Sequence, residues 1–310
     1  HMACCPHIRS LAQPQRRYAP RVPDPGMDLL SSYRLAGQAS ASAADAIATP
    51  HAPARSAAFF DVDNTIMRGA SIYHFAVGLA QHKFFNARQI WGFGVKQLKF
   101  VMSGSEDLED MASATEAALS FIEGRRVEEL TALGDTIFDE IMVDKLIPGT
   151  LALAQAHLDA GEEVWLVTAT PVELASVIAR RLGLTGALGT VSESVDGVYT
   201  GHLVGPPLHG LAKAEAIRAL AEREDLDLAK CWAYSDSSND IPMLSIVGNP
   251  VAVNPDSTLR NHAKDNDWRI RDFRRREQFK HAALPVAAGV GGVAVGLAIG
   301  FAQGRMSRRA

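Results

Sequence analysis

The sequence predicts an α/β fold in which a doubly wound, mainly parallel sheet carries an inserted helical cap. Short apolar runs that end in polar residues alternate with helical segments, an order typical of a parallel sheet with helices on both faces. Roughly 80 residues between the first two expected strands place apolar residues three and four positions apart, which indicates helices and is too long for a simple crossover. We therefore expect this insert to cover the carboxyl edge of the sheet.

Four apolar runs have the length and flanking residues of buried strands. The run at residues 57–60 leads directly into the acidic sequence DVD, as a buried parallel strand does at its end. The other expected strands are residues 163–170, 231–236 and 249–254.

Two helices and one hairpin are expected between these strands. The segment 147–161 contains Pro148 near its start and Gly161 at its end, which are helix start and stop signals. The dipeptide Asp196-Gly197 between two β-rich arms predicts a hairpin turn. A helix then resumes at residues 210–224.

The expected organisation divides the chain into five parts. Residues 1–55 are rich in Ala, Pro, Ser and Arg without a sustained apolar period, which predicts a disordered leader. The sheet core is expected at 56–70 and 147–268, and the helical cap at 71–146. Residues 269–281 are expected to form a basic linker.

Residues 282–302 are uncharged and, at ~20 residues, long enough to span a bilayer, so we expect a helix that contacts membrane lipid. More basic residues precede this segment than follow it, which predicts a cytoplasmic protein attached to the inner face of the membrane. Gly292, Gly296 and Gly300 form a small-residue face that suits a homodimer contact. The alternative is an Ala- and Gly-rich helix that packs back on the domain.

The composition argues against several classes of protein. The net charge of −4 and the pI of about 6.2 disfavour a nucleic-acid partner. Cys4 and Cys5 are adjacent and Cys231 is distant, so no disulfide framework is expected and a reducing compartment is indicated. The histidines show no zinc-binding spacing.

Polar residues that could carry chemistry cluster at or soon after the expected strand ends. In a doubly wound sheet, ligands bind outside the carboxyl ends of the strands, so these residues should converge on one site. They are Asp61, Asp63, Thr168, Lys213, Asp236 and Asp240. The alternative is that such carboxylates are solvated turn residues or helix caps, and Asp236 and Asn239 could cap a helix starting near Ile241.

Four sequence motifs, in order, resemble those of the haloacid dehalogenase superfamily. FFDVDNT is similar to motif I (DxDxT), VWLVTAT to motif II, Lys213 in GLAKAEAI to motif III, and YSDSSNDIPML to motif IV. The resemblance covers about residues 57–255, and the position of the insert resembles the C1 cap class. VDGVYTGHLVGP before Lys213 is similar to subfamily IB, the branch that includes phosphoserine phosphatase. The resemblance implies a Rossmann-like core and hydrolysis of phosphomonoesters.

The resemblance also implies roles for the candidate residues. Asp61 would attack phosphorus to form an aspartyl-phosphate, and Asp63 would protonate the leaving alcohol and later deprotonate water. Thr168, Lys213 and Asn239 would hold the phosphate. Because two close acids would repel a dianionic phosphate, a Mg²⁺ cofactor is expected. Its ligands would be the carboxylates of Asp61 and Asp236 and the backbone carbonyl of Asp63, with Asp240 beside them.

The substrate is expected to be a small phosphorylated metabolite or a lipid head group. Phosphoserine phosphatase proper is an alternative, but that enzyme uses a cap acid after motif I to hold the substrate amine. The corresponding stretch here, IMRGASIYHF, contains Ala70, Arg68 and His74 and no acid. A rival of another class is a membrane-anchored binding protein that keeps the fold without catalysis.

Overall fold

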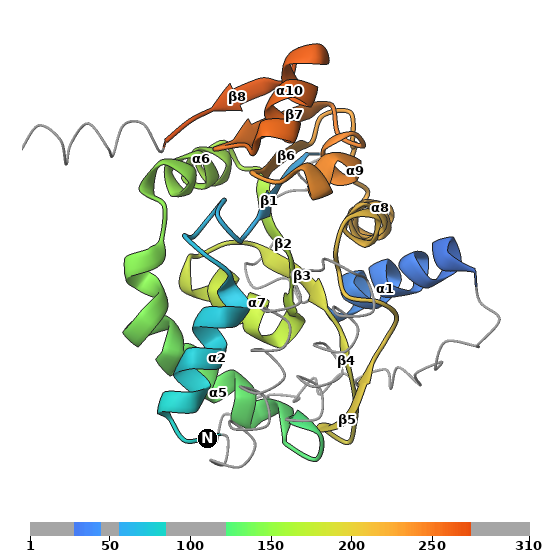
Figure 1. The fold of residues 1–310 in the computed structure, drawn as a ribbon. Helices are drawn as coiled ribbons and strands as arrows, with labels where there is room; N and C mark the ends of the chain where they lie inside the picture. Colours follow the sequence, from blue (N-terminus) through green and yellow to red (C-terminus); the bar gives the residue numbers. More distant parts are fainter. Residues whose placement is uncertain (1–27, 45–55, 85–121, 274–310) are drawn as a thin grey trace, which may run out of the picture.

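The computed structural model describes residues 28–44, 56–84 and 122–273. Its centre is a six-stranded, entirely parallel sheet in the order β3-β2-β1-β6-β7-β8 (Figure 1). This arrangement confirms the predicted fold class. The strands are β1 (Ala57–Asp61), β2 (Glu163–Pro171), β3 (Gly186–Thr190), β6 (Trp232–Ser235), β7 (Asn249–Val253) and β8 (Arg269–Arg271).

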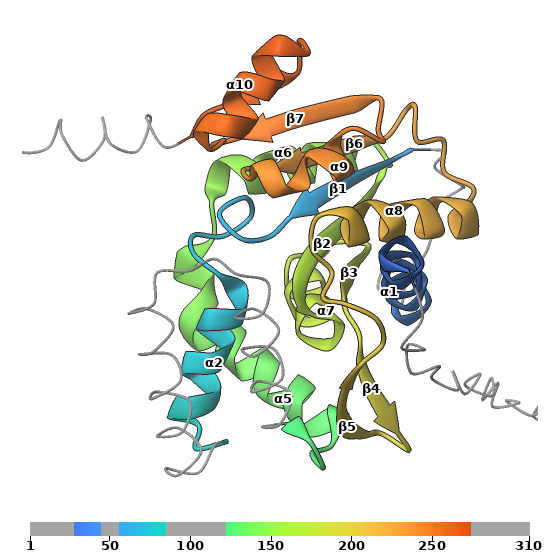
Figure 2. The same cartoon turned by 45° about the vertical axis from the view of Figure 1, so that its right-hand side comes forward.

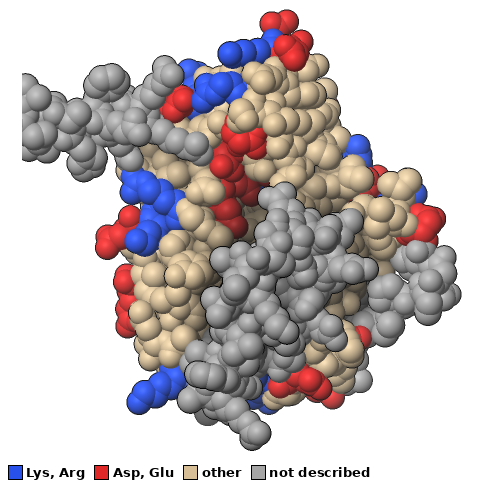
Figure 3. Space-filling model, viewed as in Figure 1, with Lys and Arg blue, Asp and Glu red and all other residues tan. Residues whose placement is uncertain are grey.

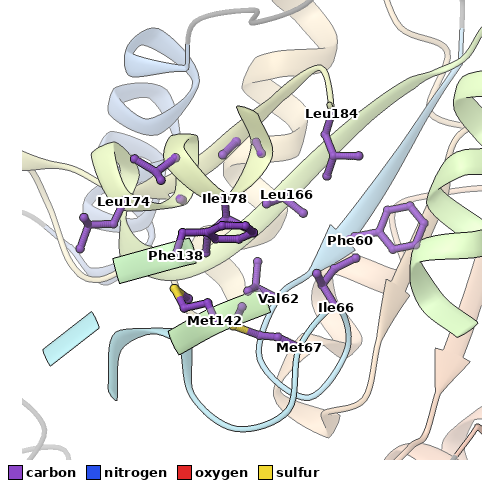
Figure 4. Packing of buried hydrophobic residues seen from close by; sticks show 14 of the residues in the cluster. Phe60, Val62, Ile66, Met67, Phe138, Met142, Leu166, Leu174, Ile178 and Leu184 are labelled. Atoms are coloured by element: carbon purple, nitrogen blue, oxygen red, sulfur yellow. The ribbon is translucent and has the colours of Figure 1, made fainter. Parts of the chain in front are cut away.

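Strand β1 lies at the centre of the sheet, and all five of its residues are buried. Successive side chains alternate between the two faces, as the pleat requires. Phe60 packs with α6 (Pro148–Asp159) and α7 (Val172–Arg181), in the core that Figure 4 shows. Phe59 packs in a second core, on the face covered by α8 (Leu211–Glu224). The continuous apolar run in the sequence reflects burial on both faces.

The other helices complete these two layers. The face that α8 covers also carries α9 (Ile241–Leu244) and α10 (Ser257–Asp265). Pro148 occupies the first turn of α6, where its missing N–H costs no hydrogen bond. Each strand and helix expected in the sheet core is thus observed with bounds shifted by a few residues at most.

The described part of the insert after β1 is mainly helical. It contains α2 (Ser71–Gln81), α5 (Val127–Ile137), a π-helical turn η1 (Phe138–Met142) and a 3₁₀ turn η2 (Val143–Lys145). Residues 85–121 of the insert, where further helices are expected, lie outside the described residues. Figures 1 and 2 show α2 and α5 beyond the end of the sheet, on the side of β4 and β5.

The predicted hairpin is observed as β4 (Ser192–Val195) and β5 (Val198–Leu203). Its turn residues have φ values of 53° for Asp196 and 77° for Gly197, the left-handed conformation that Asp-Gly turns favour. The backbone of Tyr199 in β5 makes two hydrogen bonds with the insert. Its carbonyl oxygen accepts from Gly124 N at 2.9 Å, and its N–H donates to Arg125 O at 3.0 Å. The hairpin therefore connects the sheet domain to the insert.

The prediction of a disordered leader is wrong for residues 29–43. They form α1 (Leu29–Ala43), which starts at the N-cap residue Asp28 and packs along α8 (Figure 2). The contact uses small residues: a Cβ at Gly37 would lie 2.6 Å from the backbone carbon of Glu215. A face of Ala, Gly and Ser lacks the large apolar residues that reveal an amphipathic helix in a sequence. Residues 1–27 and 45–55 of the predicted leader lie outside the described residues.

Two short strands were not predicted. Strand β8 occupies the start of the expected basic linker, where Ile270 packs on the core between exposed Arg269 and Arg271. A three-residue edge strand has only one side chain that points to the core, here Ile270. Because both neighbours of Ile270 are arginines, the sequence pattern indicated a basic linker. Strand β3, sequence GALGT, consists largely of small residues and so lacks the β-branched and aromatic residues that mark strands.

The predicted membrane-associated segment 282–302, with its glycine face, lies outside the described residues, as does the linker after residue 273. Among the helices of the described ranges, none combines the length and the apolar character that a bilayer crossing requires.

Candidate active site

A polar pocket of about 240 Å³ lies where β1, β2 and β6 end. Figure 3 shows acidic side chains gathered in a hollow on this face of the molecule. A larger hollow of about 650 Å³, between α9, α10 and β7, contains none of the predicted site residues. The smaller pocket is lined by Asp61, Asp63, Asn64, Thr168, Ala169, His209, Lys213, Asp236, Ser237, Asp240 and Asp256.

Asp61 and Lys213 form a buried ion pair in this pocket. Asp61 is the last residue of β1, and Lys213 lies in the first turn of α8. The Lys213 Nζ donates to Asp61 Oδ1 at 2.7 Å and to Asp240 Oδ2 at 2.8 Å. Burial opposes the charge of Lys213, but the carboxylates of Asp61 and Asp240 outweigh this effect and raise its pKa. The lysine is therefore a fixed cation between two carboxylates.

The pocket holds more negative than positive charge. Burial raises the pKa of Asp61 to about 8; Lys213 opposes this rise, while the charges of Asp240 and Asp63 add to it. Lys213 is the one Lys or Arg among the residues that line the pocket. A further cation or an acidic proton would relieve this imbalance.

Asp240 is held at the back of the pocket. Ser235 Oγ donates to its Oδ2 at 2.7 Å, and its buried Oδ1 accepts no hydrogen bond from any described residue. Asp240 is also the N-cap residue of α9, yet its side chain makes no capping hydrogen bond. An unsatisfied buried oxygen of this kind commonly faces an ion or water that completes its coordination.

The loop after β6 is shaped by caps other than those considered from the sequence. The Ser237 side chain accepts from Asn239 N, and Asp256 accepts from Leu259 N and Ser238 N, both at 2.7 Å. These bonds hold the loop that carries Asp236, which lines the pocket and is half-buried. Ser237 caps the 3₁₀ turn Ser238–Asp240, and the N-cap position of α9 that was considered for Asp236 or Asn239 is occupied by Asp240.

Asp63 and Thr168 complete the predicted set. Asp63 lies two residues beyond β1, and its Oδ1 accepts from the N–H of Ser71 at 2.8 Å. Thr168 is buried in β2, and its Oγ1 accepts from the N–H of Thr170 at 3.2 Å. Six of the seven predicted residues thus share one pocket. Asn239 is exposed and is not among the residues that line it.

Several lining residues were not singled out from the sequence. Asn64 and Ser237 lie within the motifs themselves, so their position beside the acids was available as a clue. Asp256 and His209 come from loops outside the motifs, and only folding brings them to the pocket. Burial and the charge of Lys213 lower the pKa of His209, while Asp240 opposes this effect. We expect this histidine to be mostly neutral at pH 7.

Several known proteins resemble this chain in sequence and fold. A family model for haloacid dehalogenase-like hydrolase matches residues 58–245. Phosphoserine phosphatase SerB1 of Mycobacterium tuberculosis is 55% identical over 252 residues, which cover 81% of this chain and 82% of that protein. A histidinol-phosphatase of Neisseria meningitidis is 29% identical over 221 residues, covering 70% and 98%. A crystal structure of a protein of unknown function from Bordetella pertussis matches with a TM-score of 0.62 and 28% identity, covering 70% of this chain and 98% of that one.

The fold and these comparisons define a hydrolase that acts on phosphoric monoesters. The chain belongs to the haloacid dehalogenase-like hydrolase family, and within it to the phosphatases that resemble phosphoserine phosphatase. The family, the enzyme class and the fold expected from the four motifs are confirmed.

Proposed function

We propose that this chain is a Mg²⁺-dependent phosphatase that hydrolyses a small phosphomonoester through an aspartyl-phosphate on Asp61. The observation that carries the proposal is the buried ion pair between Lys213 and Asp61, 2.7 Å apart in a pocket that Asp63 and Thr168 also line. A lysine held beside a nucleophilic carboxylate can bind a phosphate oxygen during in-line attack.

The proposed reaction has two steps. An Asp61 oxygen bonds to phosphorus while the bond from phosphorus to the leaving oxygen breaks, and Asp63 gives that oxygen a proton. Water then attacks the aspartyl-phosphate, Asp63 takes a proton from this water, and inorganic phosphate leaves as Asp61 is restored. Lys213 and Thr168 would hold the phosphate oxygens in both steps.

The donor atoms of the pocket suit Mg²⁺. They are carboxylate oxygens, and the buried Oδ1 of Asp240 has no hydrogen-bond partner among the described residues. Within the same residues, no three His, Cys, Asp or Glu side chains are grouped closely enough to hold an ion alone. Mg²⁺ keeps several waters and needs few protein ligands.

The proposed ligands are the carboxylates of Asp61 and Asp236 and the backbone carbonyl of Asp63, with Asp240 beside them. When bound there, Mg²⁺ would neutralise part of the charge on the phosphate and the carboxylates.

The decisive experiment compares phosphate release by the wild type, Asp61→Asn and Asp265→Asn, each with Mg²⁺ and with EDTA. Asp265 is exposed on α10, so Asp265→Asn is a matched control for the loss of one carboxylate. We expect activity in the wild type and the control with Mg²⁺ only, and none in Asp61→Asn. Mg²⁺-dependent turnover by Asp61→Asn would refute the nucleophile. A wild type inactive on every phosphate ester would favour the rival, a binding protein without catalysis.

The substrate is proposed to be a small phosphorylated metabolite or a lipid head group. The two relatives named above have different substrates in their names, phosphoserine and histidinol phosphate. The 55% identity to the former keeps phosphoserine as the second candidate. A competition assay separates the two: a phosphoserine phosphatase would prefer phosphoserine to glycerol phosphate and to phosphorylated lipids by a large factor in kcat/KM.

We also propose the tether predicted for residues 282–302, which would bring lipid head groups within reach, and the homodimer contact through Gly292, Gly296 and Gly300. The sequence alone supports both. Detergent extraction of the full chain, compared with a chain ending before His281, tests the tether. Recovery of both chains in the aqueous fraction without detergent would rule it out.

A further inference from the structure

Ser71 links the proposed acid–base residue Asp63 to strand β2. It is the first residue of α2, and its side chain is completely buried. Its N–H donates to Asp63 Oδ1 at 2.8 Å, and its Oγ lies 2.5 Å from the same oxygen. The Oγ also lies 2.7 Å from Thr170 Oγ1. One buried serine therefore contacts both the loop after β1 and the end of β2.

The directions of these hydrogen bonds follow from what each group can donate. Oδ1 of Asp63 is an acceptor both in the ionised carboxylate and in a carboxyl that carries its proton on Oδ2, so the single hydroxyl hydrogen of Ser71 is directed to Asp63. The bond between Ser71 and Thr170 must then use the hydroxyl hydrogen of Thr170. The result is a directed chain from Thr170 through Ser71 to Asp63. Both hydroxyls are buried, and burying a hydroxyl costs free energy unless it is bonded in this way.

The chain begins beside the proposed phosphate site. The N–H of Thr170 donates to Thr168 Oγ1 at 3.2 Å, two residues earlier in β2. The proposed phosphate-binding hydroxyl and the proposed acid–base carboxyl are thus held by adjacent hydrogen bonds. Two donors on Oδ1 of Asp63 fix the rotation of its carboxyl group and leave Oδ2 for the leaving group.

We infer that Ser71 and Thr170 are positioning residues that orient the Asp63 carboxyl for proton transfer to the leaving oxygen. This inference rests on the proposed function. Misplacing a catalytic group by about 1 Å can cost on the order of 10²-fold in rate. Loss of either hydroxyl should therefore slow the departure of a leaving group that needs a proton. It should slow much less the departure of a leaving group that does not need one.

The test uses two substrates of similar shape, phenyl phosphate and p-nitrophenyl phosphate. Phenolate is a basic leaving group that needs a proton, whereas nitrophenolate leaves readily without one. Release of the phenol in the first turnover isolates the first chemical step from the later attack of water. In Ser71→Ala and Thr170→Val we expect about a 10- to 100-fold slower first turnover with phenyl phosphate, and less than about 3-fold with p-nitrophenyl phosphate.

Two control variants remove buried hydroxyls that make no hydrogen bond with a described residue. Ser40→Ala on α1 matches Ser71→Ala, and Thr150→Val on α6 matches Thr170→Val. Neither control should change the ratio of the two rates. A double variant, Ser71→Ala with Asp63→Asn, should be no slower on phenyl phosphate than Asp63→Asn alone, since Ser71 acts only through Asp63.

Equal slowing on both substrates would overturn the inference, because it would mark a structural role for Ser71 and Thr170. Unchanged rates with phenyl phosphate would overturn it as well. Failure of the proposed function looks different: the wild type would release no phenol from either substrate, or Asp61→Asn would still release it.

Discussion

The Nζ atom of Lys213 lies 2.7 Å from Oδ1 of Asp61, although 152 positions separate the two residues in the sequence. The lysine reaches the carboxylate because α8 begins at the edge of the sheet where β1 ends. It also binds Asp240, so one buried cation serves two buried carboxylates.

Replacing Lys213 with Met should destabilise the fold. Removal of one partner leaves Asp61 and Asp240 buried close together without a counter-charge, which typically costs about 3–5 kcal/mol. Lys230→Met is the matched control: Lys230 pairs with Asp227 on the surface at 3.2 Å, and such pairs contribute less than about 1 kcal/mol. Urea unfolding without Mg²⁺ measures both. Equal stability of the two variants would show that the buried pair is not required by the fold.

Mg²⁺ should stabilise the protein even when no substrate is present. A ligand at 100 times its Kd adds about 2.7 kcal/mol to the free energy of unfolding, so the thermal midpoint should rise with Mg²⁺ concentration. Asp236→Asn should need a higher concentration for the same rise. Asp267 is exposed and is not among the residues that line the pocket, so Asp267→Asn should behave as the wild type. An identical Mg²⁺ response in Asp236→Asn would remove this residue from the proposed ligands.

Glu173 should make the protein less stable at alkaline pH. Burial raises the pKa of this carboxyl to about 7, from 4.5, and the hydrogen bond of its own backbone N–H only partly opposes this rise. An acid whose pKa is raised by folding loses its proton earlier in the unfolded state, so stability falls as the pH rises from about 4.5 to above 7.

Glu173→Gln replaces the ionisable carboxyl with a neutral amide, so no charge has to be buried at high pH. The variant should therefore be stabilised relative to the wild type by about 2 kcal/mol more at pH 8 than at pH 5. Urea unfolding at the two pH values gives the difference directly. Glu193→Gln is the control, since Glu193 lies in the hairpin and pairs with Thr200. A pH-independent effect of Glu173→Gln would contradict the assigned burial of its charge.

Replacing Gly37 with Ala should destabilise the contact between α1 and α8. Ala is favoured over Gly inside a helix by about 1 kcal/mol, so a loss of stability can come only from packing. The added Cβ would lie 2.6 Å from the Glu215 backbone carbon and 2.7 Å from Ala216 N, and overpacking of this kind costs about 1–3 kcal/mol. Gln38→Ala, on the exposed side of α1, should be neutral or stabilising. If Gly37→Ala were as stable as Gln38→Ala, the close packing of α1 would be refuted.

The sequence by itself determined the four central strands of the sheet and most of the pocket. Strand β1 is apolar up to its last residue, Asp61, because it is buried on both faces, and the acids of motif I lie at its carboxyl end. The order of the strands along the chain was sufficient to predict the pocket, since the carboxyl ends of parallel strands lie at one edge of the sheet.

Only the tertiary structure decided which polar groups form hydrogen bonds with one another and which small residues pack together. The packing of α1 could not be predicted from the sequence because its buried residues are small and Gly37 has no side chain. The burial of Ile270 in β8 could not be predicted because its neighbours are charged. The hydrogen bonds that Ser71 makes with Asp63 and with Thr170 join residues 8 and 99 positions apart. A hydroxyl group can be exposed to water or can form hydrogen bonds in the interior. Its role therefore depends on its neighbours after folding, which no local sequence pattern predicts.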